Sequence, residues 1–264
     1  MGANIMKKIL FAIFFVFIFF TGQLIFPQTS EDLIQQGDSL ISNFNDQGAL
    51  QKFQQADKLT PDNWEVLWRL SRVTVNVANQ MPTNTDDQKD AQLAQYQKAF
   101  NYADRAVKLA PDKSVTYLRR AIADGKIALF KGVFSVGGVV NATKDDCERA
   151  IQLGNGGNFV QALAHYVLAR TNAKVSEKAK ILRWPLGLAW ADNETAIVEY
   201  KKAIALYPNF RMFYLDYARS LIREDEYKTA REMLNKVFTC TKQESDDDQR
   251  VSEAKALLEE IKNE

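Results

Sequence analysis

The sequence predicts an all-α protein in which about five consecutive helix pairs stack as a superhelix. Glycine and proline, the residues that interrupt helices, make up about 7% of the 264 residues, against an average near 12%. A spacing of small residues, large apolar residues and proline recurs along the chain. Two stretches, which begin at Ser30 and Arg211, carry this spacing without a gap. Helix pairs that repeat in this way each bury one face against the next pair.

The first pair begins at Ser30. Counting Ser30 as position 1 places Gly37, Ala49 and Ala56 at positions 8, 20 and 27, where only small residues allow two helices to cross closely. Large apolar residues fill positions 4, 11 and 24, and Pro61 at position 32 ends the second helix. This is the spacing of the tetratricopeptide repeat, a 34-residue pair of antiparallel helices.

The second half of the repeat recurs in the middle of the chain. Its copies contain Ala99, Ala103, Ala106 and Pro111, then Cys147, Ala150 and Asn155, then Ala196, Tyr200, Ala203 and Pro208. The predicted pairs are 30–63, 64–113, 114–157, 158–210 and 211–244. The three middle pairs are longer than 34 residues, and we expect the additional residues to lengthen the first helix or its connection, at 81–90, 131–143 and 174–193. The alternative is an ordinary helical bundle with alanine-rich crossings.

A last helix over 246–262 is predicted to cap the stack. The acids Asp246, Asp247 and Asp248 suit a helix N-terminus. Its apolar residues follow helical spacing, so that one face can close the core of the last pair. Those residues are Val251, Ala254, Leu257, Leu258 and Ile261.

Residues 1–28 have the character of an export signal. Lys7 and Lys8 precede twelve unbroken apolar residues, 9–20, and polar residues follow. A cleaved signal peptide is the favoured interpretation. An uncleaved anchor over 9–26 is the alternative, because ~17–25 apolar residues span a bilayer. Either way we expect residues 29–264 to form one repeat domain in the periplasm or cell envelope, with membrane contact through 9–26 if the segment is retained.

Composition excludes several functions. Outside residues 1–28 the chain carries 32 basic and 33 acidic residues, so nucleic-acid binding lacks its electrostatic driving force. The two cysteines, Cys147 and Cys240, do not make a disulfide framework or a zinc site. His165 is the only histidine, and no catalytic motif surrounds it, so we expect a hydrogen-bonded structural histidine. We therefore expect no enzymatic activity, cofactor or metal.

Two glycine-rich segments also suggest sites. The segment 154–158 lacks the Gly-Lys-Ser/Thr ending of a phosphate loop, and we interpret it as a helix stop. The apolar segment 132–138 bridges two helices or lines a pocket, and bridging is favoured. Asp246–Asp248 lacks the alternating acids and glycine of a calcium loop. Cys147 occupies a packing position, which predicts a buried thiol.

From Tyr96 to about Glu260 the chain resembles the regulator of microtubule dynamics family of tetratricopeptide proteins and its bacterial relatives. The resemblance implies a non-enzymatic helical scaffold. The microtubule role belongs to eukaryotic members and is not expected beside a bacterial-looking export signal. The family's Gly-Arg-Trp segment is replaced here by Ala164-His165-Tyr166. The similar segments are ADRAVKLAPD (103–112), AIADGKIALFKG (121–132), CERAIQLG (147–154), AIVEYKKAIALYPNFRMFYLDYARSLI (196–222) and YKTAREMLNKV (227–237).

Candidate binding residues come from the geometry of stacked repeats. Positions 2, 5, 9 and 12 of each first helix point into the concave face, and here they combine aromatic, aliphatic and arginine side chains. Such a surface suits an extended peptide or an amphipathic ligand, with arginine available to a carboxylate or phosphate. The alternative is that the longer segments fold over the groove and bury it. The candidates are Glu65, Trp68, Arg72, Leu118, Ile122, Met212, Leu215 and Arg219.

The sequence therefore predicts an exported, non-enzymatic scaffold that binds a partner protein or peptide in a concave helical groove. The alternative is an accessory protein of an envelope transport system that binds a lipid or small hydrophobic molecule, since the partner proteins of tripartite solute transporters are similar in architecture. An enclosed apolar cavity of ~300 Å³ or more would favour this alternative.

Overall fold

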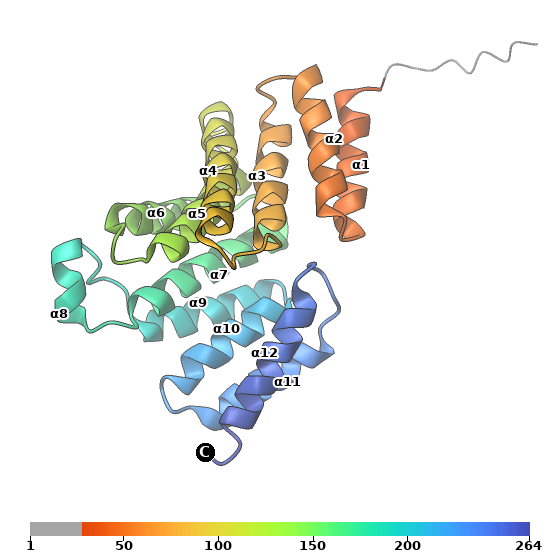
Figure 1. Ribbon diagram of the computed structural model, residues 1–264. Helices are drawn as coiled ribbons and strands as arrows, with labels where there is room; N and C mark the ends of the chain where they lie inside the picture. The colour runs from red at the N-terminus through yellow and green to blue at the C-terminus, as the bar shows by residue number, and fades with distance from the viewer. Residues whose placement is uncertain (1–27) are drawn as a thin grey trace, which may run out of the picture.

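The computed structural model describes residues 28–264, and in that range it contains helices and no strand (Figure 1). The predicted export signal or anchor over 9–26 lies outside the described residues. Of the helices within 28–264, none combines the length and the hydropathy that a transmembrane span requires.

Ten of the twelve α-helices of the described chain form five antiparallel pairs, one short helix lies within the fourth pair, and the last helix follows them (Figure 1). The predicted all-α superhelix of about five pairs with a capping helix is thereby confirmed. The pairs are α1 (Ser30–Ser42) with α2 (Asp46–Leu59), α3 (Trp64–Asn79) with α4 (Asp86–Leu109), α5 (Ser114–Lys131) with α6 (Gly137–Leu153), α7 (Gly157–Val175) with α9 (Asn193–Leu206), and α10 (Arg211–Ile222) with α11 (Tyr227–Thr239). The fourth pair also contains the short helix α8 (Lys180–Arg183) in its connection, and the last helix is α12 (Asp247–Glu260).

Local hydrogen bonds define where many of these helices begin and end. The Thr29 side chain accepts a hydrogen bond from the backbone of Asp32, whose carboxylate accepts one in return, and this capping box starts α1. Asn63 and Asp192 cap α3 and α9 in the simpler manner. Gly154 adopts a left-handed conformation and ends α6, as predicted for the helix stop.

The small residues of the repeat lie at the helix crossings, as the spacing predicts. Ala49, Ala99, Ala196 and Ala230 are all fully buried. Gly37 of α1 lies directly against the Phe53 ring of α2, so close that a methyl group at this position would overlap the ring. The two helices of the first pair therefore approach each other closely at Gly37, as the repeat spacing predicts.

The additional residues of the middle pairs do not all lie where the sequence analysis placed them. In the second pair they extend the second helix, because a capping box between Thr85 and Gln88 starts α4 early and gives it 24 residues. The expectation that the first helix or its connection would be longer is wrong there. In the third pair α5 has 18 residues and a short connection follows. In the fourth pair α7 has 19 residues and its connection contains α8 and the 3-10 helix η1 (Trp184–Leu186).

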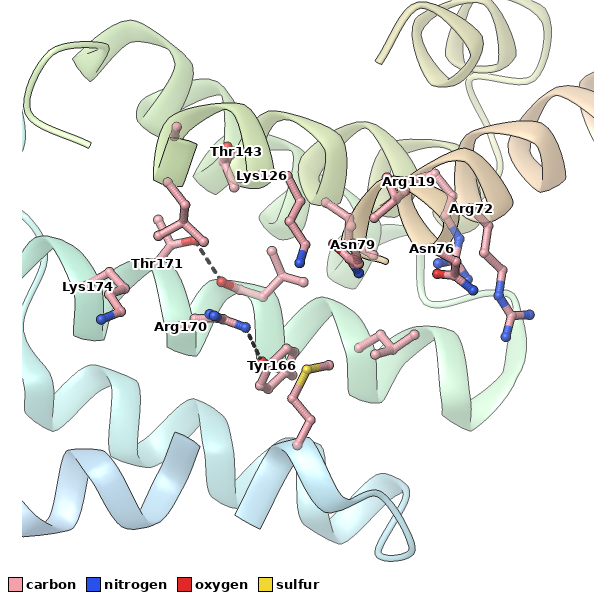
Figure 2. A pocket seen from close by; sticks show the side chains of 18 of the residues that line it. Arg72, Asn76, Asn79, Arg119, Lys126, Thr143, Tyr166, Arg170, Thr171 and Lys174 are labelled. Atoms are coloured by element: carbon pink, nitrogen blue, oxygen red, sulfur yellow. Dashed lines mark hydrogen bonds between the residues drawn. The ribbon is translucent and has the colours of Figure 1, made fainter. Parts of the chain in front are cut away.

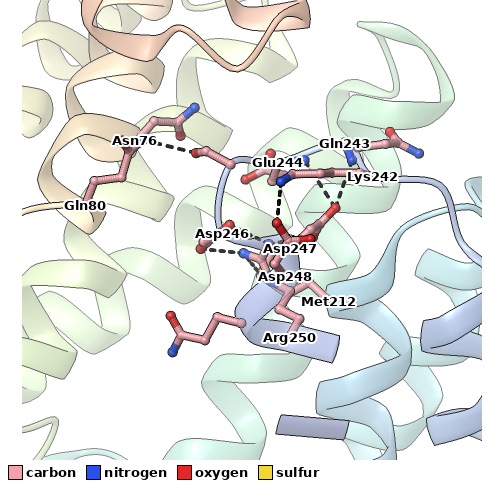
Figure 3. Close-up of polar contacts among 12 residues, drawn as sticks. Asn76, Gln80, Met212, Lys242, Gln243, Glu244, Asp246, Asp247, Asp248 and Arg250 are labelled. Carbon is pink, nitrogen blue, oxygen red and sulfur yellow. Dashed lines mark hydrogen bonds and ion pairs between the residues drawn. The ribbon is translucent and has the colours of Figure 1, made fainter. Parts of the chain in front are cut away.

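The connection between α11 and α12, residues 240–246, joins the two ends of the superhelix, and we refer to it as the strap. The Ser245 hydroxyl donates to Asp46 Oδ2 at 3.0 Å. Gln80 Nε2 lies within hydrogen-bond distance of both the Ser245 hydroxyl and Asp46 Oδ2, and Figure 3 shows Gln80 together with residues of the strap. Asp46 begins α2 in the first pair. The strap therefore ties the last pair of helices to the first across about 200 residues of sequence.

Candidate functional site

The first helices of the second, third and fourth pairs surround a pocket, which has a volume of about 130 Å³. Side chains of α3, α5 and α7 form most of its wall (Figure 2). Residues of α6, the start of α10, the strap and α12 complete it. Apolar side chains from three of these helices, including Val75, Ile122 and Leu163, line part of the surface. The segment 132–138 connects α5 to α6, as favoured, and its Val133 also lines the pocket.

Charge is the distinctive feature of this pocket, which we call the cationic pocket. Six basic side chains line it, and Glu244 of the strap is the single acidic residue among its lining residues. Three of the cations form ion pairs with carboxylates: Arg170 with Asp216 at 3.5 Å, Lys174 with Glu177 at 2.7 Å and Arg250 with Asp247 at 2.7 Å. The other three, Arg72, Arg119 and Lys126, form no ion pair with any residue of the described chain.

Arg119 is the most buried of the unpaired cations. Only 7% of the residue is exposed, and its Nε is buried without a hydrogen-bond partner in the described part of the chain. The guanidinium carbon lies 5.7 Å from the ring centroid of Trp68, a weak cation–π contact. Burial, with the neighbouring charge of Arg72, lowers the pKa of Arg119 to about 9. The guanidinium of Arg119 can therefore still donate a hydrogen bond from Nε to an acceptor on a ligand.

Lys126 extends from α5 toward α7 and into the cationic pocket (Figure 2). Burial, together with the charge of Arg170, lowers the pKa of the Lys126 ammonium to about 8. A lysine in this environment remains largely protonated near neutral pH, and no carboxylate of residues 28–264 forms an ion pair with it.

A hydrogen-bond network on α7 and α10 holds one wall of the cationic pocket. The Tyr166 hydroxyl donates to Asp216 Oδ2 at 2.6 Å and accepts from Arg170 Nη1 at 2.9 Å. Burial raises the pKa of Asp216, but the charges of Arg170 and Arg219 outweigh it and hold the pKa below its ordinary value. Because Asp216 is already an ionised partner for these arginines, this wall is preorganised and less open to a new anion than the wall that carries Arg119 and Lys126.

The predicted binding residues fall into three groups in the structure. Arg72, Ile122 and Met212 line the cationic pocket. Trp68 lines a neighbouring depression, to which Arg72 and Glu244 also belong. Glu65 lies outside both hollows and pairs with Arg69 at 3.6 Å.

Three of the predicted residues are not available in the way the sequence analysis assumed. Leu118 and Leu215 are 0% and 2% exposed and pack in the largest hydrophobic core, so neither presents a surface to a partner. Arg219 lines neither hollow and is paired with Asp216 at 2.6 Å and with Glu253 of α12 at 2.5 Å. The projection of positions along isolated helices did not include the packing of α12 and α7 against the same faces.

Sequence reasoning missed the cations that give the cationic pocket its character. Arg119 and Lys126 lie at positions 6 and 13 of the third pair, one place beyond the positions projected inward. No residue of α7 was projected, although Arg170 and Lys174 reach the pocket from that helix. The sequence signal that could have found them is the presence of Arg and Lys next to the inward positions. Such long side chains place their charge several ångströms from the backbone and can still reach the pocket.

The remaining sequence candidates have structural roles. His165 Nδ1 lies 2.5 Å from Glu199 Oε2, and Lys202 binds the other oxygen of the same carboxylate. Burial raises the pKa of Glu199, but the hydrogen bonds from His165 and Lys202 hold it below its ordinary value. Cys147 is fully buried, as its packing position predicts. Asp247, the first residue of α12, accepts hydrogen bonds from the backbone of the strap and so shapes this connection.

Comparison with known proteins identifies the family. A sequence profile described as regulator of microtubule dynamics protein 1-3 matches residues 33–262. The chain belongs to this family. The predicted resemblance is confirmed, and it extends further toward the N-terminus than the segments that first carried it. No curated protein matches the sequence.

Solved structures support the same repeat architecture. The structure of a thermophilic TPR protein from Thermus thermophilus is similar, with a TM-score of 0.60 and 18% sequence identity, over 87% of this chain and 100% of that one. MamA from Desulfovibrio magneticus RS-1 matches over 81% of this chain and 95% of that one, with a TM-score of 0.47 and 16% identity. The former similarity shows a shared tetratricopeptide fold.

Proposed function

We propose that this protein is an exported, non-enzymatic scaffold that binds a partner protein or peptide along the face containing the cationic pocket. The observation that carries the proposal is a preformed pocket whose wall combines apolar side chains with three cations that lack ion pairs in the described chain. A preformed concave surface on stacked helix pairs favours binding of extended segments, because the scaffold loses little conformational entropy when it binds.

The pocket dimensions favour a peptide over a carried lipid. Pockets for whole small molecules commonly measure about 300–1,000 Å³. The volume of the cationic pocket, about 130 Å³, is below this range and suits one or two side chains of a larger partner. The neighbouring depression has a volume of about 440 Å³, but charged and polar side chains make up half of its lining, so it is not an apolar lipid cavity. A lipid-binding accessory protein of an envelope transport system is therefore the less favoured function.

Export is the part of the proposal that rests on residues 1–28 alone. The positive start and the short apolar stretch support it. Fractionation of the host, with sequencing of the N-terminus of the mature chain, tests both export and cleavage. Recovery of the intact chain in the cytosolic fraction would contradict export and leave the binding proposal in place.

The binding proposal is tested by capture of partners from the host envelope fraction, with mass spectrometry of what is retained. Trp68→Ala should weaken capture of a stoichiometric partner about tenfold, because aromatic side chains beside arginines commonly dominate such contacts. The matched control is Trp184→Ala, which removes an exposed tryptophan from η1, outside the pocket lining. Equal capture by both variants would exclude the proposed face. A stoichiometric lipid or metabolite in the purified protein would favour the other function.

A further inference from the structure

We propose that the cationic pocket accepts an acidic side chain from the partner peptide, and that Glu244 of the strap is its internal competitor. This inference rests on the proposed function and adds the chemical class of the partner. Three features of the structure carry it: the unpaired cations, the position of Glu244 and the size of the pocket.

The unpaired cations need an anion. Arg72 on α3 and Arg119 and Lys126 on α5 line the same pocket and pair with no carboxylate of the described chain. A cation removed from water without a partner loses hydration that nothing replaces. Proteins normally pair such charges, and a buried unpaired donor is therefore a position where a ligand supplies the missing acceptor.

Glu244 of the strap brings a carboxylate of the chain itself to the same pocket. It is the single acid among the residues that line the pocket, and it forms no ion pair in the described chain (Figure 3). Burial raises the pKa of Glu244, although the charges of Arg72 and Arg250 act in the opposite direction. The hydrogen bonds of Ser245 to Asp46 and Gln80 hold the strap in place. Glu244 is therefore close enough to Arg72 and Arg250 to be affected by their charges, but it forms no ion pair with either in the described chain.

The size of the pocket selects the kind of anion. A volume of about 130 Å³ admits a carboxylate on a short apolar stem. An acyl chain needs a longer apolar cavity, and a nucleotide needs a larger one. A glutamate or aspartate of an extended peptide fits the apolar lining around Ile122 and Val75 and directs its carboxylate toward Lys126, while Arg119 and Arg72 lie further along the pocket wall (Figure 2).

The test uses a phage-displayed library of random dodecapeptides selected on the immobilised mature protein. Selected peptides should share an acidic residue. A synthetic copy of one such peptide should bind in calorimetry, and its Glu→Gln form should bind about tenfold more weakly. Lys126→Met should weaken binding of the acidic peptide by a similar factor and not that of the Gln peptide. Lys201→Met, at an exposed position of α9, is the matched control and should change neither.

The role of the strap is tested by Glu244→Gln, which should strengthen binding of the acidic peptide a few-fold because an internal competitor is removed. Unchanged affinity would overturn this part of the inference. Lys126→Met is preferred over Arg119→Met because Lys126 is only partly buried, and thermal unfolding of each variant confirms that it folds.

The outcomes separate the two proposals. Enriched peptides whose binding depends on Trp68 but not on Lys126 or an acid would overturn the inference and leave the proposed function standing. Failure to enrich any peptide would overturn both. Sedimentation with phosphatidylglycerol vesicles, if abolished by Lys126→Met while no acidic peptide is selected, would overturn the peptide proposal in favour of a lipid headgroup.

Discussion

At the scale of single residues, the unpaired cations of the cationic pocket lower the stability of the free protein and leave donors available to a ligand. Arg119, which is buried, and Lys126, which is partly buried, would stabilise the fold more if they were apolar, since their charges are poorly solvated and form no ion pair within residues 28–264. Residues that destabilise the free protein in this way are typical of sites that wait for a ligand. Asp216 and Glu199, in contrast, are buried with several donors and act as structural anions.

Lys126→Met should make the free protein more stable at neutral pH by about 1–3 kcal/mol, because a poorly solvated charge is removed. The pKa of Lys126 is about 8 in the folded state and near its ordinary value of 10.5 in the unfolded state. Between these values the unfolded chain binds the extra proton, so the stability of the wild type rises with pH across this window. The advantage of the variant should therefore shrink as pH rises from about 8 to 10.5.

Urea unfolding of wild type and Lys126→Met at a series of pH values from about 7 to 10.5 measures this difference. Lys201→Met should track the wild type throughout. A stability difference that is constant with pH would show that Lys126 has an ordinary pKa and is well solvated in the folded protein.

At the scale of helices, the small residues at crossings set the distance within each pair. Gly37 illustrates this most clearly, because an added Cβ would lie 2.3 Å from Cε1 of the fully buried Phe53 ring. The ring is fully buried in the core cluster that α1, α2 and α3 form, and close packing of such a core resists its displacement. The helix-forming advantage of alanine over glycine is smaller than the resulting strain.

Gly37→Ala should lower the free energy of unfolding by about 1–3 kcal/mol through overpacking. Gly138→Ala in α6 is the matched control, because nothing lies within 4 Å of its added Cβ. The control should leave stability unchanged or raise it by up to about 1 kcal/mol. Chemical denaturation of both variants provides the comparison, and equal stabilities would show that α1 and α2 can separate without cost.

At the scale of the whole molecule, the strap determines the relation between the first and last helix pairs. Repeat proteins usually contact only their nearest neighbours, so their ends move independently. Here Ser245 and Gln80 share the carboxylate of Asp46, and α12 packs Ala254 and Ile261 into the core of the last pairs. The closure also positions Glu244 at the cationic pocket.

A double-mutant cycle of Ser245→Ala and Gln80→Ala should give a coupling energy of about 0.5–1 kcal/mol, since the two side chains share one acceptor. The double variant should also exchange the amide hydrogens of residues 240–246 faster than the wild type. Additive effects with unchanged exchange would show that the strap is held by other contacts. Thr239→Ala, at the exposed end of α11, serves as the control.

The fold was largely predictable from the sequence, because the repeat spacing acts over short range. Small residues such as Gly37, Ala99 and Ala196 recur at intervals set by helix geometry. Each indicates a point where its helix crosses the adjacent helix. The start of α4 was missed, although the capping box at Thr85 and Gln88 was present as a local signal.

The candidate site was predictable only in part, since Arg72, Ile122 and Met212 were found and Arg119, Lys126 and Arg170 were not. Whether a cation is free or paired depends on which acids lie near it in space, and for Arg170 that acid is distant in sequence. Asp216 neutralises Arg170 from another helix pair, whereas no acid of the described chain forms an ion pair with Lys126.

The sequence by itself therefore determined the helix pairs, their order and the capping helix. Each of these features depends on residues of one repeat and of the repeat next to it in the sequence. Only the tertiary structure decided that Leu118 and Leu215 are core residues, that the strap returns to Asp46 and that three cations without ion pairs in the described chain line one pocket. Packing between segments far apart in the sequence produces these features, and no local spacing encodes it.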